Sequence, residues 1–119
     1  YKRCLYVVKE IQRTLQAAEL LEQNNIEAFG QLMYETHEGL SRDYEVSCEE
    51  LDFLVKEANR LQVTGSRLMG GGFGGCTINI IRKQEHEETV SAITSAYKHR
   101  FGAEPGIIDI SIADGSHKL

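Results

Sequence analysis

The stretch Gly70-Gly71-Gly72-Phe73-Gly74-Gly75 runs directly into Cys76-Thr77-Ile78-Asn79-Ile80-Ile81. Five of the six residues 70–75 are glycine. Glycine lacks a Cβ, so it can adopt positive φ angles and its backbone can approach a ligand closely. Consecutive backbone N–H groups in such a loop form a concave nest that suits phosphate oxygens. The alternating, β-branched residues of the second stretch predict a strand. The sequence here therefore predicts a glycine loop between two strands, either as a phosphate-contacting element or as a plain hairpin turn.

Two common phosphate-binding motifs are excluded by the residues that come after the glycines. Gly70, Gly72 and Gly75 match the spacing G-x-G-x-x-G, but the dinucleotide-binding form of that motif needs a helix directly after it. A Walker A loop needs Lys-Ser/Thr after its last glycine, and this chain has Cys76-Thr77 there.

Composition narrows the class of protein. The chain has 119 residues, a net charge of −5 and no basic stripe, so one domain is expected and a nucleic-acid partner is not. The sequence shows no apolar run long enough for a membrane helix, so no membrane partner is expected. Cys4, Cys48 and Cys76 lie far apart without a C-x-x-C pair. This pattern predicts a reduced, cytoplasmic protein with no zinc site.

Two helices are expected at the front of the chain. Apolar residues in a 4-3-4-3 spacing predict an amphipathic helix over residues 3–22. Asn24 is the expected N-cap of the second helix, with Glu27 completing a capping box. The predicted buried faces are Cys4, Val8, Ile11, Leu15 and Ala18 on the first helix, and Ile26, Phe29, Met33, Thr36 and Leu40 on the second. Because the chain opens at Tyr1 inside a helical pattern, we expect it to be part of a longer polypeptide.

The rest of the chain predicts a mixed α+β region. A capping box at Ser47 and Glu50 starts a third helix that stops before Gly65. Strands at 66–69 and 76–82 flank the glycines, a fourth helix covers 85–100, and a last strand with period 2 covers 108–112. This order matches a ferredoxin-like β-α-β-β-α-β pattern without its first strand. We therefore predict an α+β domain in which a helical hairpin, residues 1–41, joins a ferredoxin-like region, residues 42–119.

Two segments resemble a known family. Asp43-Tyr44-Glu45-Val46-Ser47-Cys48-Glu49-Glu50-Leu51-Asp52, followed by Gly65-Ser66-Arg67-Leu68-Met69 and the glycine stretch, resembles the C-terminal domain of the galactokinases, a branch of the GHMP kinases. The glycine stretch is similar to the third signature motif of that superfamily, and residues 43–52 point to galactokinases among its members. One departure is Gly70, where many galactokinases have Thr.

The resemblance implies a function for a longer protein. Galactokinases transfer the γ-phosphoryl of MgATP to the C1 hydroxyl of galactose and so produce galactose 1-phosphate. ATP, Mg and galactose would be held mainly by an N-terminal kinase domain, which also carries the catalytic Asp and Arg. No catalytic residue or metal ligand is therefore expected in this chain, which alone should be inactive. The nucleotide and phosphate-loop region implied here is Gly70, Gly71, Gly72, Phe73, Gly74 and Gly75, with Arg67 as a further candidate.

Several alternatives stay open. The longer protein could be another small-molecule GHMP kinase, or a non-catalytic galactokinase-like regulator that binds sugar and ATP. From the residues alone, a ferredoxin-like ligand-binding module is also open. We expect His37 to be a packing or hydrogen-bonding histidine and not a ligand. We expect Asp43 and Glu45 to be connector residues and not an acid–base pair. Without the N-terminal domain, exposed apolar surface is expected to cause dimerisation or aggregation.

Overall fold

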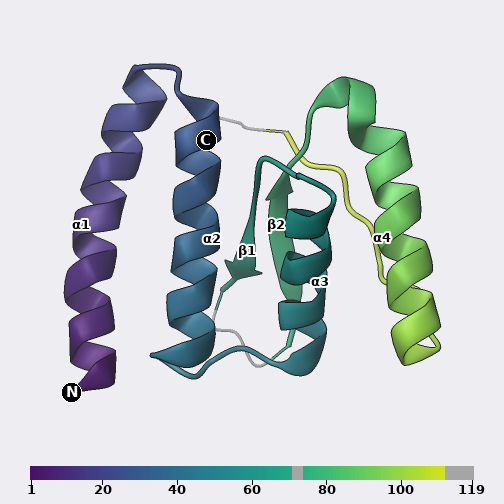
Figure 1. Cartoon of the computed structure of the whole chain (residues 1–119), viewed down its shortest axis with the longest axis horizontal. Coiled ribbons are helices and arrows are strands. Elements are labelled where there is room, and N and C mark those ends of the chain that lie inside the picture. Colours follow the sequence, from purple (N-terminus) through teal and green to yellow (C-terminus); the bar gives the residue numbers. More distant parts are fainter. Residues whose placement is uncertain (71–73, 112–119) are drawn as a thin grey trace, which may run out of the picture.

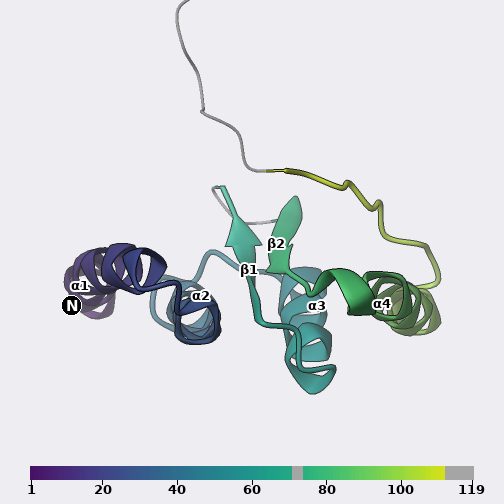
Figure 2. The same ribbon diagram turned by 90° about the horizontal axis from the view of Figure 1, so that it is seen from above.

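The computed structural model describes residues 1–70 and 74–111. Within them, α1 and α2 form a helical pair beside a two-stranded hairpin, α3 packs against the hairpin, and α4 lies beyond α3 (Figure 1). Seen from above, the two strands lie on one side of the helices (Figure 2). This confirms the α+β class. The elements are α1 (Lys2–Glu22), α2 (Ile26–Arg42), α3 (Glu49–Arg60), β1 (Gly65–Met69), β2 (Cys76–Ile80), the 3-10 helix η1 (Lys83–Glu85) and α4 (His86–Phe101).

β1 and β2 pair antiparallel, from Gly65 opposite Ile80 to Met69 opposite Cys76. The glycine stretch therefore joins two paired strands, as predicted. β1 is the more buried strand, and the side chains of Ser66 and Leu68 are fully buried. It is buried because α2 runs along it and α3 packs against it.

α1 ends at Glu22 as predicted, but the N-cap of α2 lies one residue later than the capping pattern placed it. Asn24 has a φ of 56°, and the Asn25 N–H donates to the Leu20 carbonyl at 2.8 Å. These features form a Schellman motif, in which the left-handed position suits Asn. Asn25 then caps α2, because its side chain accepts from the Ala28 N–H at 3.2 Å. The predicted capping box at Asn24 and Glu27 is therefore wrong.

The capping box predicted at Ser47 is also wrong. α3 begins at Glu49, and its N-cap is Cys48, which makes no side-chain cap. The Ser47 hydroxyl instead donates to Asp52 Oδ1 at 2.7 Å. A hydroxyl that faces a carboxylate gains a charge-assisted hydrogen bond, and here that bond replaces the cap.

α1 packs on α2 through a different face from the predicted one. Tyr6 is buried, with its ring against Gly39. Next along this face, Glu10 accepts from the Thr36 hydroxyl at 2.9 Å and from Arg13 at 2.5 Å. The packing of the Tyr6 ring and the hydrogen bonds of Glu10 therefore determine which face of α1 contacts α2, although another face carries more apolar side chains. The predicted face stays outside, where Val8, Ile11 and Leu15 are 56%, 58% and 67% exposed.

The last strand, predicted at 108–112, is not formed in the described residues. Residues 104–111 run as irregular chain, and Ile108 and Ile110 are exposed. A strand needs a neighbouring backbone to pair with, and the sheet of the described part contains β1 and β2 alone. Ile112 lies outside the described residues.

α4 follows the prediction more closely. It ends at Phe101, where Gly102 has a φ of 77° and serves as the C-cap. Its buried Ile93 joins Ala58 of α3 and Val63 in a small apolar core. Among the described residues, no helix combines the length and apolar character that crossing a bilayer requires.

Candidate functional site

The described ends of the glycine loop need glycine for their backbone conformation. Gly70, Gly74 and Gly75 have φ angles of 79°, 125° and 86°. A Cβ added to any of them would meet nothing within 4 Å, so the positive φ rather than crowding requires glycine. Gly70 and Gly75 are exposed, so a ligand can reach their backbone. The other predicted site residues of this loop, Gly71, Gly72 and Phe73, lie outside the described residues.

Arg67 lies in β1, three residues before Gly70, and is opposite Ile78 in the register. Its Nη1 donates to the Leu68 carbonyl at 3.2 Å. Within residues 1–70 and 74–111 it forms no ion pair. Its charge is therefore not matched by a described carboxylate.

In the same residues, no group of three His, Cys, Asp or Glu side chains is arranged to hold a metal ion.

A buried hydrogen-bond network lies directly behind this end of the hairpin. The Leu68 N–H donates to His37 Nδ1 at 3.1 Å, and His37 Nε2 lies 2.8 Å from Asp52 Oδ1. Because Nδ1 accepts from the backbone, the ring hydrogen of a neutral His37 is on Nε2 and points at Asp52. The predicted role of His37 as a hydrogen-bonding histidine is confirmed.

Asp52 collects three hydrogen bonds. Besides the one from His37, the Ser47 hydroxyl donates at 2.7 Å and the Ser41 hydroxyl at 3.0 Å. Partial burial raises the pKa of Asp52, but the hydrogen bonds from Ser47, His37 and Ser41 outweigh it and hold the pKa below its usual value. The carboxylate is therefore the charged centre that joins α2, the connector and α3.

The network contains Ser, His and Asp, but it is not a nucleophilic triad. In a triad, the serine bonds the ring nitrogen opposite the one that faces the aspartate. Here both serines bond Asp52, and the far nitrogen of His37 faces a backbone N–H. The His37 side chain is also only 6% exposed, so it is closed to a substrate. The arrangement is suited to holding backbone in place.

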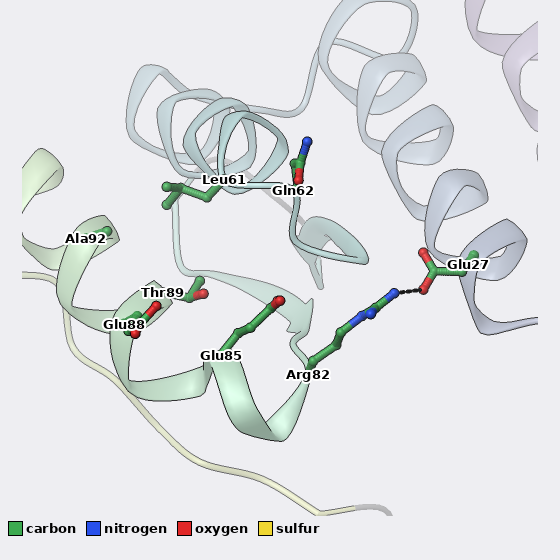
Figure 3. A pocket seen from close by; sticks show the side chains of 8 residues that line it. All are labelled: Glu27, Leu61, Gln62, Arg82, Glu85, Glu88, Thr89 and Ala92. Carbon is green, nitrogen blue, oxygen red and sulfur yellow. Dashed lines mark hydrogen bonds and ion pairs between the residues drawn. The ribbon is translucent and has the colours of Figure 1, made fainter.

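A hollow lies at the opposite end of the hairpin (Figure 3). It has a volume of about 680 Å³ and lies where β2 ends and α4 begins. Arg82 projects into it and pairs with Glu27 at 2.5 Å. With one cation among three carboxylates, this hollow is poorly suited to phosphate. It is lined by Glu27, Leu61, Gln62, Arg82, Glu85, Glu88, Thr89 and Ala92.

Comparison with known proteins identifies the family. The family model described as GHMP kinases C terminal matches residues 17–99, well over half of the chain. The chain belongs to the GHMP kinase family. It is 42% identical to the galactokinase of Clostridium acetobutylicum over 99% of its own length, which confirms the resemblance seen in the sequence. That match covers 31% of the relative, so the chain spans about a third of the length of such curated relatives.

Solved structures of the family support the same assignment. The Lactococcus lactis galactokinase complexed with galactose superimposes with a TM-score of 0.81 at 33% identity, covering 87% of this chain and 27% of that one. The L. major mevalonate kinase in complex with R-mevalonate gives a TM-score of 0.64 at 28% identity, covering 71% and 26%. The chain therefore has the fold of the galactokinase C-terminal region.

The sequence predicted the glycine hairpin but not the network behind it. Gly30, Tyr34, His37 and Ser41 follow a 4-3-4 spacing, which places them on one face of α2. Three polar residues on one face of a helix that also carries buried apolar residues are a signal that could have indicated the network. The other carboxylates considered, Asp43 and Glu45, do not form an acid–base pair. Glu45 is exposed and pairs with Lys2 at 2.9 Å.

Proposed function

We propose that this chain is the C-terminal part of an ATP-dependent galactokinase, which transfers the γ-phosphoryl of MgATP to the C1 hydroxyl of galactose. The observation that carries the proposal is the TM-score of 0.81 to a galactokinase complexed with galactose, against 0.64 to a mevalonate kinase. The 42% identity to a curated galactokinase supports galactose as the acceptor over other substrates of the family.

In this proposal the chain supplies one wall of the nucleotide site. The backbone of Gly70, Gly74 and Gly75 is exposed or half-buried and adopts positive φ, as expected for a nest that faces phosphate oxygens. Arg67, near this end of β1, would add positive charge. Phosphoryl transfer depends mainly on positioning and on stabilising charge, so a wall without a general base can contribute. ATP and Mg would be held mainly by an N-terminal kinase domain.

The exposed stripe on α1, which we define as Val8, Ile11 and Leu15, is the proposed contact with that domain. These three side chains are more than half exposed, and burying such a surface is favourable by about 25 cal/mol per Å². The curated relatives extend well beyond the part that matches this chain, and the remainder of such a protein would contain the domain that covers this stripe.

The free thiols of Cys4, Cys48 and Cys76 support a cytoplasmic location.

Calorimetry tests the proposal. MgATP and galactose are titrated into this chain and into the product of the complete reading frame, and galactose 1-phosphate formation is assayed for both. We expect binding and transfer only with the complete product. Turnover with mevalonate or homoserine instead would indicate another GHMP kinase. Binding of sugar and ATP without turnover would indicate a regulator. Tight binding by this chain alone would contradict a site shared between two domains.

A further inference from the structure

α2 holds the backbone of β1 through side-chain hydrogen bonds. Tyr34 Oη donates to the Val63 carbonyl at 2.6 Å, just before the strand begins. Near the other end of the strand, the Leu68 N–H donates to His37 Nδ1 at 3.1 Å. Leu68 is fully buried, so its N–H would have no access to water if His37 were removed. A buried donor left unpaired is strongly unfavourable, and His37 is therefore a specific restraint on this strand.

This restraint lies next to the glycine loop. Met69 alone separates Leu68 from Gly70, where the chain turns with a φ of 79°. Glycine imposes little conformational restriction of its own, so the direction in which the loop leaves β1 depends on what holds the residues before it. Arg67, on the same strand, donates to the Leu68 carbonyl. Among the described residues, the hydrogen bond from the Leu68 N–H to His37 is the side-chain contact that ties the backbone at this point to another element.

Asp52 holds His37 in the orientation that this contact needs. It accepts from His37 Nε2 and keeps the hydrogen-bond acceptor, Nδ1, directed at β1. The hydroxyls of Ser41 and Ser47 hold the carboxylate from α2 and from the connector. A continuous chain of hydrogen bonds thus leads from α3 through Asp52 and His37 to the backbone of Leu68.

We propose that His37 and Asp52 are positioning residues that set the place of the glycine loop and thereby the affinity for the phosphates of ATP. The proposal rests on the proposed kinase function. Neither residue touches a phosphate in it, because His37 is buried behind the strand and the Asp52 carboxylate would repel a phosphate. The effect is transmitted through the backbone of Leu68 to Gly70.

Two substitutions at His37 separate its two hydrogen bonds. In His37→Asn, the amide oxygen lies near the position of Nδ1 and keeps the acceptor for Leu68, but the contact with Asp52 is lost. In His37→Gln, the longer amide reaches Asp52 in place of Nε2 and the acceptor for Leu68 is lost. Tyr34→Phe is the matched control, because it removes the other hydrogen bond from α2, to Val63, and leaves Leu68 untouched.

The first measurement is steady-state kinetics of the complete product with ATP and galactose. We expect His37→Gln to raise KM for ATP about tenfold with kcat within about twofold, and His37→Asn to stay within about threefold of wild type, since one buried hydrogen bond accounts for changes of this order. Tyr34→Phe should lower the melting temperature without raising KM for ATP. An unchanged KM in His37→Gln, or an equal rise in Tyr34→Phe, would overturn the proposal.

The second measurement is amide hydrogen exchange on this chain, which needs no kinase activity. His37→Gln should speed exchange at Leu68 about tenfold and shift the amide resonances of Gly70 and Gly74, whereas His37→Asn, which keeps the acceptor for Leu68 but loses the support of Asp52, should change both by clearly less. If the wild-type product transfers no phosphate, the proposed function fails, and these resonances decide the positioning role alone. Unshifted loop resonances in His37→Gln would then refute it. Should His37→Gln not fold, Ser47→Ala is expected to shift the same resonances to a smaller extent.

Discussion

Gly30 is the point of closest approach between α2 and the start of β1, and Gly30→Ala tests whether this contact defines the fold. A Cβ on Gly30 would lie 1.9 Å from the Thr64 carbonyl oxygen and 2.5 Å from its carbonyl carbon. Both neighbours are backbone atoms, which cannot rotate away. The helix and the strand would have to separate, and this separation would stretch the hydrogen bonds that Tyr34 and His37 make to the strand.

The expected cost follows from these contacts. Overpacking costs about 1–3 kcal/mol, each of the two stretched hydrogen bonds contributes about 1 kcal/mol, and the better helix propensity of Ala returns about 1 kcal/mol. We therefore expect Gly30→Ala to lower the free energy of unfolding by about 3 kcal/mol. The matched control is Gly39→Ala on the same helix, whose Cβ would lie 2.5 Å from Tyr6 Cε2. That ring can shift, so the expected loss is about 1 kcal/mol.

Urea unfolding of the chain, followed by circular dichroism, measures both values by linear extrapolation. The comparison within one helix removes the propensity term, since both variants gain it equally. A Gly30→Ala variant as stable as wild type would refute the reasoning, and so would a Gly39→Ala variant that loses more stability than Gly30→Ala. Either result would mean that α2 does not cross β1 as closely as the structure places it.

Three further predictions use other parts of the molecule. Because the folded pKa of Asp52 lies below the usual value of 3.8, its stabilisation is present above that pH and is lost as the pH falls through the folded pKa. Urea titrations at several pH values should therefore show a flatter acid loss of stability in Asp52→Asn, and equal slopes would contradict this. Ile11→Lys with Leu15→Lys should shift self-associated chain toward monomer in light scattering, because both side chains are exposed; an unchanged oligomeric state would argue against the α1 stripe. Gly102→Ala should cost about 1 kcal/mol in urea unfolding, since its φ is 77°, whereas Gly106→Ala, which has open space and no positive φ, should cost almost nothing.

Much of the fold was predictable because periodicity records burial along each helix. The third and fourth helices and the glycine hairpin were found where the patterns placed them. The packed face of α1 was not, for a clear reason. Residues 6, 10, 13, 17 and 20 have the same spacing as the apolar stripe around Val8 and Ile11, so periodicity allows either face. The face of α1 that contacts α2 is determined by the packing of the Tyr6 ring against Gly39. A hydropathy pattern records which residues are apolar, but not which side chains fit together.

The error at 108–112 has a similar origin. Ile108 and Ile110 alternate with polar residues as a half-buried strand does, yet both are exposed. Alternation indicates the surface a segment can cover, but hydrogen-bond pairing requires a second backbone. The exposed isoleucines and the α1 stripe are thus apolar patterns with no described partner. Both agree with the proposal that this chain packs against a further kinase domain.

The failed prediction at Ser47 leads to the candidate site itself. A Ser before a helix with Glu three residues later favours a capping box, and losing such a cap costs about 1 kcal/mol. In the structure that cap is absent, and the Ser47 hydroxyl donates to Asp52 instead. Asp52 in turn accepts from His37, and His37 accepts from the backbone of β1. Local rules tend to be broken where another requirement outweighs them, often at functional sites. Here the missing cap lies at Ser47, which bonds Asp52, the partner of His37. The hydrogen bond from Ser47 to Asp52 therefore explains both the wrong capping prediction and part of the proposed positioning role.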